Sequence, residues 1–101
     1  MLEINLKQLE SFVATVEHSG FTAAAAALYL TQSTVSAHVS ALEQTLGVPL
    51  LVRDRHTVAL TPAGQTLLTG AEDLLRQADA LAAAVHTAAE AAPELPEPPE
   101  A

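Results

Sequence analysis

Apolar residues near the start of the chain recur every three or four positions, which is the spacing of one helix face. A helix is predicted over residues 6–18 and is expected to stop at Gly20. A second helix is expected to start at Thr22, whose hydroxyl can cap the first turn, and to run through five alanines to Leu28. The core face of the first helix consists of Leu6, Leu9, Phe12, Val13 and Val16.

A third helix is predicted over residues 32–46, with Thr31 as its N-cap and Gly47 as its end. Apolar residues at positions 35, 39, 42 and 46 keep the helical spacing. The preceding turn, residues 29–31, is short, so the third helix should cross the second and point its first polar residues outward. The outward face is expected to hold Gln32, Ser33, Ser36, Ala37 and Ser40.

Two short segments, residues 50–53 and 57–60, are expected to pair as a hairpin around Asp54, Arg55 and His56. A two-stranded hairpin is marginally stable alone, so this one must pack against the helices. A last helix is predicted from Pro62 to about residue 92. Thr61 is a good N-cap for it, and proline is favoured at the first helical position.

The last helix carries an apolar seam at alternating steps of four and three. This seam is longer than a small domain can cover, so a partner helix is expected to bury it in a dimer. The alternative is packing on the first helix, which could bury only the first half of the seam. The residues expected to dimerise are Leu67, Leu68, Ala71, Leu74, Leu75, Ala78, Leu81 and Val85.

The length of 101 residues, half of them apolar, supports one small domain with appendages. We expect a domain at 1–61, the long helix at 62–92 and a disordered Pro/Glu-rich tail at 93–101. The fold class is therefore predicted to be mainly α. The expected architecture is a winged helix-turn-helix with a small two-stranded β wing and a long C-terminal dimerisation helix.

Several kinds of chemistry find no support in the sequence. The absence of cysteine excludes disulfides, cysteine-based zinc sites and thiol catalysis. The four histidines lack metalloenzyme spacing, and no glycine-rich phosphate loop is present, so we expect no catalytic site, metal or cofactor. No apolar run approaches a membrane span and no signal-peptide pattern opens the chain, so the expected compartment is the cytoplasm.

Charge argues against an obvious nucleic-acid binder, because the net charge is −8. The acidity is unevenly distributed: residues 1–60 hold three basic and five acidic side chains, whereas residues 61–101 hold one and seven. Most of the negative charge thus lies on the last helix and the tail. The predicted helix-turn-helix is still poor in cations.

The motifs of residues 21–64 closely resemble the DNA-binding domain of LysR-type bacterial transcriptional regulators. Phe-Thr-x-Ala-Ala matches residues 21–25, Thr-Gln-x-x-Val-Ser matches 31–36, and Leu-Glu-x-x-Leu-Gly matches 42–47. Arg53 and the Leu-Thr-x-Ala-Gly of residues 60–64 follow at the family's spacing. One departure is the family's Leu-Phe pair, which reads Leu50-Leu51 here.

The resemblance implies a homodimeric regulator that binds a dyad site in double-stranded DNA, with the third helix in the major groove and the wing on the backbone or in the minor groove. The alternatives are that the polar helix face is merely solvated and that Arg53 or Arg55 forms a surface ion pair with Asp54 or Glu43. The DNA-binding residues implied are Thr22, Thr31, Gln32, Ser33, Ser36, Ala37, Ser40, Arg53, Arg55 and His56.

Ala23, Ala37, Ser40 and Ala41 stand where many family members carry long polar or basic residues. Fewer phosphate contacts should make non-specific DNA binding weak and give DNA binding a shallow dependence on salt. A second hypothesis is therefore a protein-interaction module that heterodimerises with a full-length relative or another partner and binds little DNA. LysR-type regulators continue into an effector-binding domain, which this sequence does not include, so no small-molecule effector site is expected in it.

Overall fold

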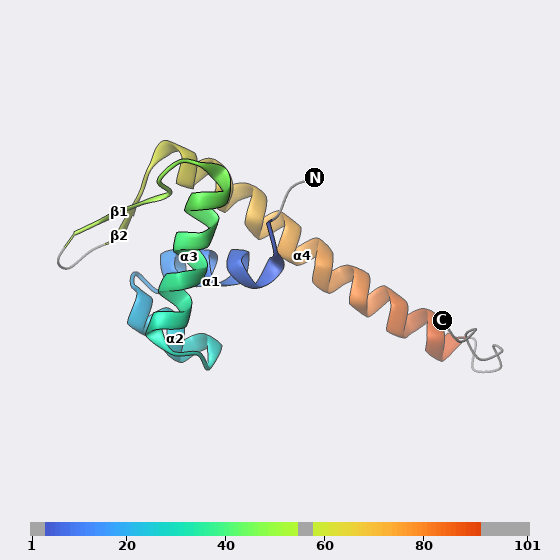
Figure 1. Ribbon diagram of the computed structural model, residues 1–101. Helices are drawn as coiled ribbons and strands as arrows, with labels where there is room; N and C mark the ends of the chain where they lie inside the picture. Colours follow the sequence, from blue (N-terminus) through green and yellow to red (C-terminus); the bar gives the residue numbers. More distant parts are fainter. Residues whose placement is uncertain (1–3, 55–57, 92–101) are drawn as a thin grey trace.

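The computed structural model describes residues 4–54 and 58–91, which form four helices and a two-stranded sheet (Figure 1). The predictions made for Arg55, His56 and the tail 93–101 lie outside the described residues. The mainly α winged helix-turn-helix is confirmed. In chain order the elements are α1 (Leu6–Glu17), α2 (Phe21–Leu28), α3 (Gln32–Leu46), β1 (Leu51–Arg53), β2 (Val58–Leu60) and α4 (Pro62–Ala91).

Helix α1 is the centre of the domain and packs against α2, α3 and α4. The Asn5 side chain caps its start by accepting the Gln8 backbone N–H at 2.8 Å. Leu9, Phe12 and Val13 are buried, as the spacing predicted. Leu6, assigned to the same face, is 45% exposed because it lies in the first turn, at the end of the packed region.

The connection between α1 and α2 differs from the sequence prediction. Helix α1 ends at Glu17, and the left-handed residue that follows is Ser19 (φ 57°). The Gly20 N–H then bonds to the Thr15 carbonyl at 3.0 Å. This turn leads directly into α2. Gly20 is therefore the N-cap of α2, and because glycine has no side chain, no side chain caps this helix. The assignment of Thr22 as the cap was wrong: Thr22 lies inside the first turn, and its side chain is exposed.

Helix α3 follows the prediction at both ends. The Thr34 backbone N–H donates to the Thr31 hydroxyl at 3.1 Å, and Gly47 ends the helix in the left-handed conformation (φ 73°). Tyr29 makes the turn before it, also with a left-handed backbone, and its side chain is 95% exposed. The α2 alanines at 24 and 25 are buried against Val35, so their small size lets α2 and α3 approach closely.

The wing is a short antiparallel pair in which Leu51 lies opposite Leu60 and Arg53 opposite Val58. Strand β1 begins at Leu51, one residue later than predicted, and the Leu50 carbonyl before it accepts the Thr61 backbone N–H at 3.0 Å. Leu51 is also buried, whereas Val52 and Arg53 are exposed. The base of the wing is thus anchored in the core while its described outer part is open.

Helix α4 starts as predicted, with the Gly64 N–H donating to the Thr61 hydroxyl at 3.0 Å. Gly64 is required for close approach, because a Cβ there would collide with the carbonyl oxygen of Leu50. The first half of α4 packs on the core through Leu67, Leu68, Ala71 and Leu75, and the second half projects away from the other helices (Figure 1). No helix in the described part of the chain is long and apolar enough to cross a membrane.

Candidate nucleic-acid interface

The start of α3 presents a polar surface to solvent. Gln32, Ser33 and Ala37 are exposed, as the sequence predicted. Ser36 and Ser40 were expected to be equally exposed but are half-buried, because they lie on the flank of the helix between the buried Val39 side and the outward Ala37 side. The outward surface is therefore narrower than expected, with Ser33 and Ala37 at its centre.

Thr31 has a structural task in the turn that precedes α3. Its hydroxyl accepts the Thr34 N–H, donates to the Thr34 hydroxyl at 2.8 Å and lies 3.3 Å from the Ser33 hydroxyl. The bond from the Thr34 N–H satisfies one of the free backbone donors of the first turn and helps to fix the backbone from which Gln32 and Ser33 project. The side chain of Thr31 remains exposed at the same end of α3 as these two residues.

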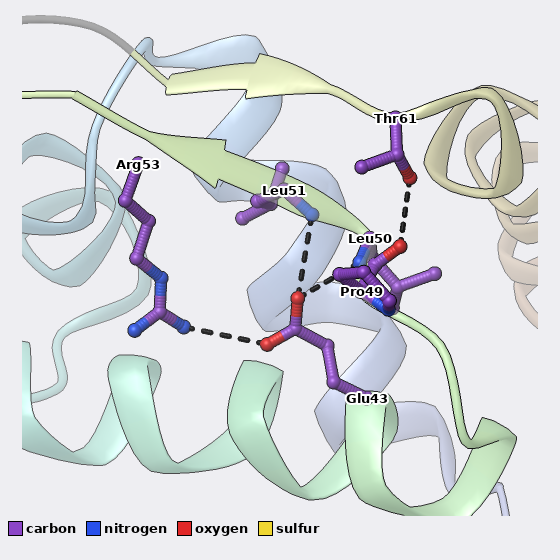
Figure 2. A network of polar contacts seen from close by, with 6 residues as sticks. All are labelled: Glu43, Pro49, Leu50, Leu51, Arg53 and Thr61. Atoms are coloured by element: carbon purple, nitrogen blue, oxygen red, sulfur yellow. Dashed lines mark hydrogen bonds and ion pairs between the residues drawn. The ribbon is translucent and has the colours of Figure 1, made fainter.

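Glu43 joins α3 to the wing through both carboxylate oxygens (Figure 2). Its Oε2 accepts the backbone N–H groups of Leu50 at 2.8 Å and Leu51 at 3.3 Å. Its Oε1 lies 3.5 Å from the Arg53 guanidinium. One side chain thus holds the backbone that enters β1 and the cation at the end of β1.

Arg53 also contacts α2, since its guanidinium carbon lies 5.0 Å from the centroid of the Phe21 ring, within cation–π range. The Arg53 side chain nevertheless remains 45% exposed. The sequence left a choice between DNA contact and an ion pair with Asp54 or Glu43. The structure shows the ion pair with Glu43 and also leaves part of the guanidinium accessible.

Ser11 and His38 support α3 from its inner side, and sequence reasoning missed them. The Ser11 hydroxyl is fully buried on α1 and lies 2.6 Å from Nδ1 of His38 on α3. The signal was a serine among the apolar residues of α1, opposite a histidine on the next-but-one helix. The pair is a polar tie between the central helix and the helix with the exposed polar face.

The predicted dimerisation residues divide into two groups along α4. The core-facing group consists of the buried Ala71 and the half-buried Leu67, Leu68 and Leu75. Leu74, Leu81 and Val85 are 50%, 67% and 60% exposed, and Ala78 is half-buried between the groups. The expectation that α1 covers only the first half of the seam therefore agrees with this packing, and three large apolar side chains stay uncovered in the single chain.

Within residues 4–54 and 58–91, no group of three or more histidine or acidic side chains is arranged to hold a metal ion. The other described arginine, Arg76, lies on α4 and pairs with Asp73 at 3.4 Å. Because that pair is highly exposed on both sides, it contributes little to stability. Among the described residues, the exposed start of α3 offers amide and hydroxyl groups for hydrogen bonding, and the end of β1 offers the charge of Arg53.

Comparison with known sequences matches the chain to one family and to several longer bacterial proteins. The family described as "Bacterial regulatory helix-turn-helix protein, lysR family" matches residues 6–65. A probable hydrogen peroxide-inducible genes activator of Streptomyces viridosporus is 46% identical over 77 residues, which cover 76% of this chain and 25% of the relative. The Hca operon transcriptional activator HcaR of Escherichia coli K12 is 43% identical over 76 residues, covering 75% and 26%. The chain thus spans about a quarter of the length of these relatives.

Two solved DNA complexes share the fold. The DNA-binding domain in the CbnR–DNA complex has a TM-score of 0.79 and 34% identity, and the match covers 84% of this chain and 98% of that one. The corresponding domain of BenM, in complex with catB site 1 DNA, has a TM-score of 0.81 and 35% identity, with coverage of 84% and 96%. By motif, fold and sequence match, the chain belongs to the lysR family of bacterial regulatory helix-turn-helix proteins.

Proposed function

We propose that this chain binds double-stranded DNA as the reading module of a transcriptional regulator. The observation that carries the proposal is the exposed polar start of α3 together with the half-exposed guanidinium of Arg53, which pairs with Glu43 farther along the same helix. A helix of this kind fits the major groove, where glutamine can pair with adenine and serine can serve either base type. The likeness to two domains solved with DNA supports the same assignment.

The proposed contacts divide by chemistry. Gln32, Ser33 and Ser36 would meet base edges, and Arg53 would meet a phosphate, with the methyl group of Ala37 available for apolar contact. Thr31 would act mainly by fixing the start of α3, given its bonds to Thr34. The full proposed set is Thr22, Thr31, Gln32, Ser33, Ser36, Ala37, Ser40, Arg53, Arg55 and His56.

The proposed assembly is a homodimer formed along α4. Leu74, Leu81 and Val85 are uncovered in the single chain, and a second α4 would bury them. Two copies related by a twofold axis would present two α3 helices to two half-sites, so the expected target is a dyad. In this arrangement residues 1–61 read DNA and residues 62–92 dimerise.

Replacement of Arg53 by alanine tests the proposal, with retention on a duplex and dimer mass measured for both proteins. The expected result is an intact dimer whose DNA affinity falls. The slope of the logarithm of the DNA-binding constant against the logarithm of the salt concentration should become shallower by about 0.9 for each phosphate that the variant no longer neutralises. Equal affinity and an equal slope in both proteins would contradict the role of Arg53.

A second candidate is a protein-interaction module with little affinity for DNA. The observation that favours it is charge: Glu43 partly neutralises Arg53 at 3.5 Å, and the net charge is −8. Here the uncovered apolar side chains of α4 would pair with a full-length relative. A wild-type dimer that binds no duplex at low salt would support this candidate over DNA binding.

A further inference from the structure

Glu43 is an acidic residue on the helix proposed to approach an acidic polymer. A carboxylate near phosphate groups repels them, so its presence there calls for a compensating task. In the structure this carboxylate forms two backbone hydrogen bonds and one ion pair (Figure 2). All three partners belong to the segment that leads into and forms β1.

We propose that Glu43 is the positioning residue that sets the wing and Arg53 relative to α3, an inference that rests on the proposed DNA-binding function. The carboxylate reaches from α3 to this segment and bridges to Leu50, Leu51 and Arg53 at once (Figure 2). The Arg53 side chain therefore takes its direction from α3, the same element that carries Gln32.

The opposite side of the same segment is held by α4 and the residue that caps it. Thr61 donates its hydroxyl to the Pro49 carbonyl at 2.8 Å and its backbone N–H to the Leu50 carbonyl at 3.0 Å. Gly64 lies directly against that Leu50 carbonyl. Residues 49–51 are thus fixed between α3 and α4, and Glu43 makes the hydrogen bonds on the α3 side.

Arg53 has a further constraint that makes its direction specific. Its guanidinium lies over the Phe21 ring at 5.0 Å, and Phe21 begins α2. Between ring and carboxylate the arginine loses rotamer freedom before it meets DNA, so less entropy is lost on binding. The half-exposed remainder of the guanidinium can then approach a phosphate oxygen without leaving Glu43.

The test is Glu43→Gln, because positioning and simple electrostatics predict opposite signs. The amide keeps one oxygen for the Leu50 and Leu51 N–H groups but turns an NH2 group toward Arg53. If Glu43 only repels phosphate, removal of its charge strengthens DNA binding. If it positions Arg53, affinity for a duplex selected with the wild-type dimer falls about fivefold, the scale of one charge-assisted contact.

Two controls separate this effect from other causes. Glu17→Gln removes the same charge from the exposed end of α1 and should leave affinity unchanged or slightly stronger. In an Arg53→Ala background, Glu43→Gln should no longer weaken binding, since the residue it positions is gone. Equal losses in both backgrounds, or a gain in affinity from Glu43→Gln alone, would overturn the proposal.

A readout on the free protein keeps this inference separate from the proposed function. Nitrogen-15 relaxation of the Arg53 side chain should show greater mobility in Glu43→Gln than in the wild type, at an unchanged fold by circular dichroism. Unchanged mobility would overturn the positioning role whatever the DNA result. A wild-type dimer that binds no duplex would instead overturn the proposed function and Glu43's role in it, while relaxation would still decide whether Glu43 holds Arg53.

Discussion

The hydroxyl of Ser11 lies 2.6 Å from Nδ1 of His38, and this contact ties the centre of α1 to the middle of α3. Ser11 is fully buried, so its hydroxyl needs a partner inside the protein. The imidazole of His38 is that partner, and the two residues are 27 positions apart in the sequence. The helix proposed to read DNA is thus held on its α1-facing side by a specific polar contact as well as by the apolar core.

Replacement of Ser11 by alanine should lower the free energy of unfolding by about 1 kcal/mol, because it removes a buried hydrogen bond to His38. Chemical denaturation at fixed protein concentration measures the change. The matched control is Thr15→Val, which removes a buried hydroxyl that only donates to a carbonyl within α1. For Thr15→Val we expect the free energy of unfolding to fall by less than about 0.5 kcal/mol. Equal effects at both positions would show that the Ser11–His38 contact has no special weight.

Two glycines of α4 should respond to alanine with opposite signs. Gly64→Ala places a methyl group against the Leu50 carbonyl and should destabilise the fold by at least about 2 kcal/mol. Gly70→Ala meets nothing within 4 Å and should stabilise the helix by up to about 1 kcal/mol. Thermal unfolding of the two variants at the same concentration compares them directly. A Gly64→Ala protein as stable as the wild type would contradict the close approach of α4 to the wing base.

Leu81 and Val85 should be needed for dimerisation. Replacing both by glutamate removes apolar burial from each protomer and places like charges opposite one another, so the dimer dissociation constant should rise at least about 100-fold. Sedimentation equilibrium measures it. Ala83→Glu adds a charge about half a turn away, on the other side of α4, and should change the constant little. Dimers of equal strength in both variants would place the interface elsewhere.

Gln32 and Arg53 should affect DNA binding in different ways. Gln32→Ala should cost about 1–3 kcal/mol on the preferred sequence and little on unrelated duplexes, because a base contact carries sequence information. Arg53→Ala should weaken both classes of duplex alike, because a phosphate contact does not. Titrations of each variant against preferred and scrambled duplexes at several salt concentrations compare these effects. A uniform loss for Gln32→Ala would remove it from the base-reading set.

The sequence predicted those parts of the structure that depend on local chemistry. Thr31 and Thr61 cap α3 and α4, and Gly47 ends α3, because each acts within a few residues of its own position. Thr22 failed as a cap because the left-handed Ser19 brings Gly20 to the helix start. That outcome depends on how α1 and α2 meet, which local preference does not determine.

The site was predicted less completely than the fold. The polar face of α3 could be located from its motif, but the half-burial of Ser36 and Ser40 depends on neighbouring elements. Glu43 accepts hydrogen bonds from the backbone of residues 50 and 51 across a turn whose shape cannot be read from the sequence, so residue spacing alone could not reveal these bonds. Arg53 was ambiguous because the same side chain serves an ion pair and remains accessible.

Sequence-specific DNA binding by a dimer can be tested by selecting bound duplexes from a randomised pool at low salt, with protein of confirmed dimeric mass. We predict enrichment of a dyad whose two half-sites lie about one helical turn, or a multiple of it, apart. The Gln32→Ala protein should lose that enrichment. A folded wild-type dimer that enriches no sequence would contradict sequence-specific DNA binding and turn attention to protein partners of α4.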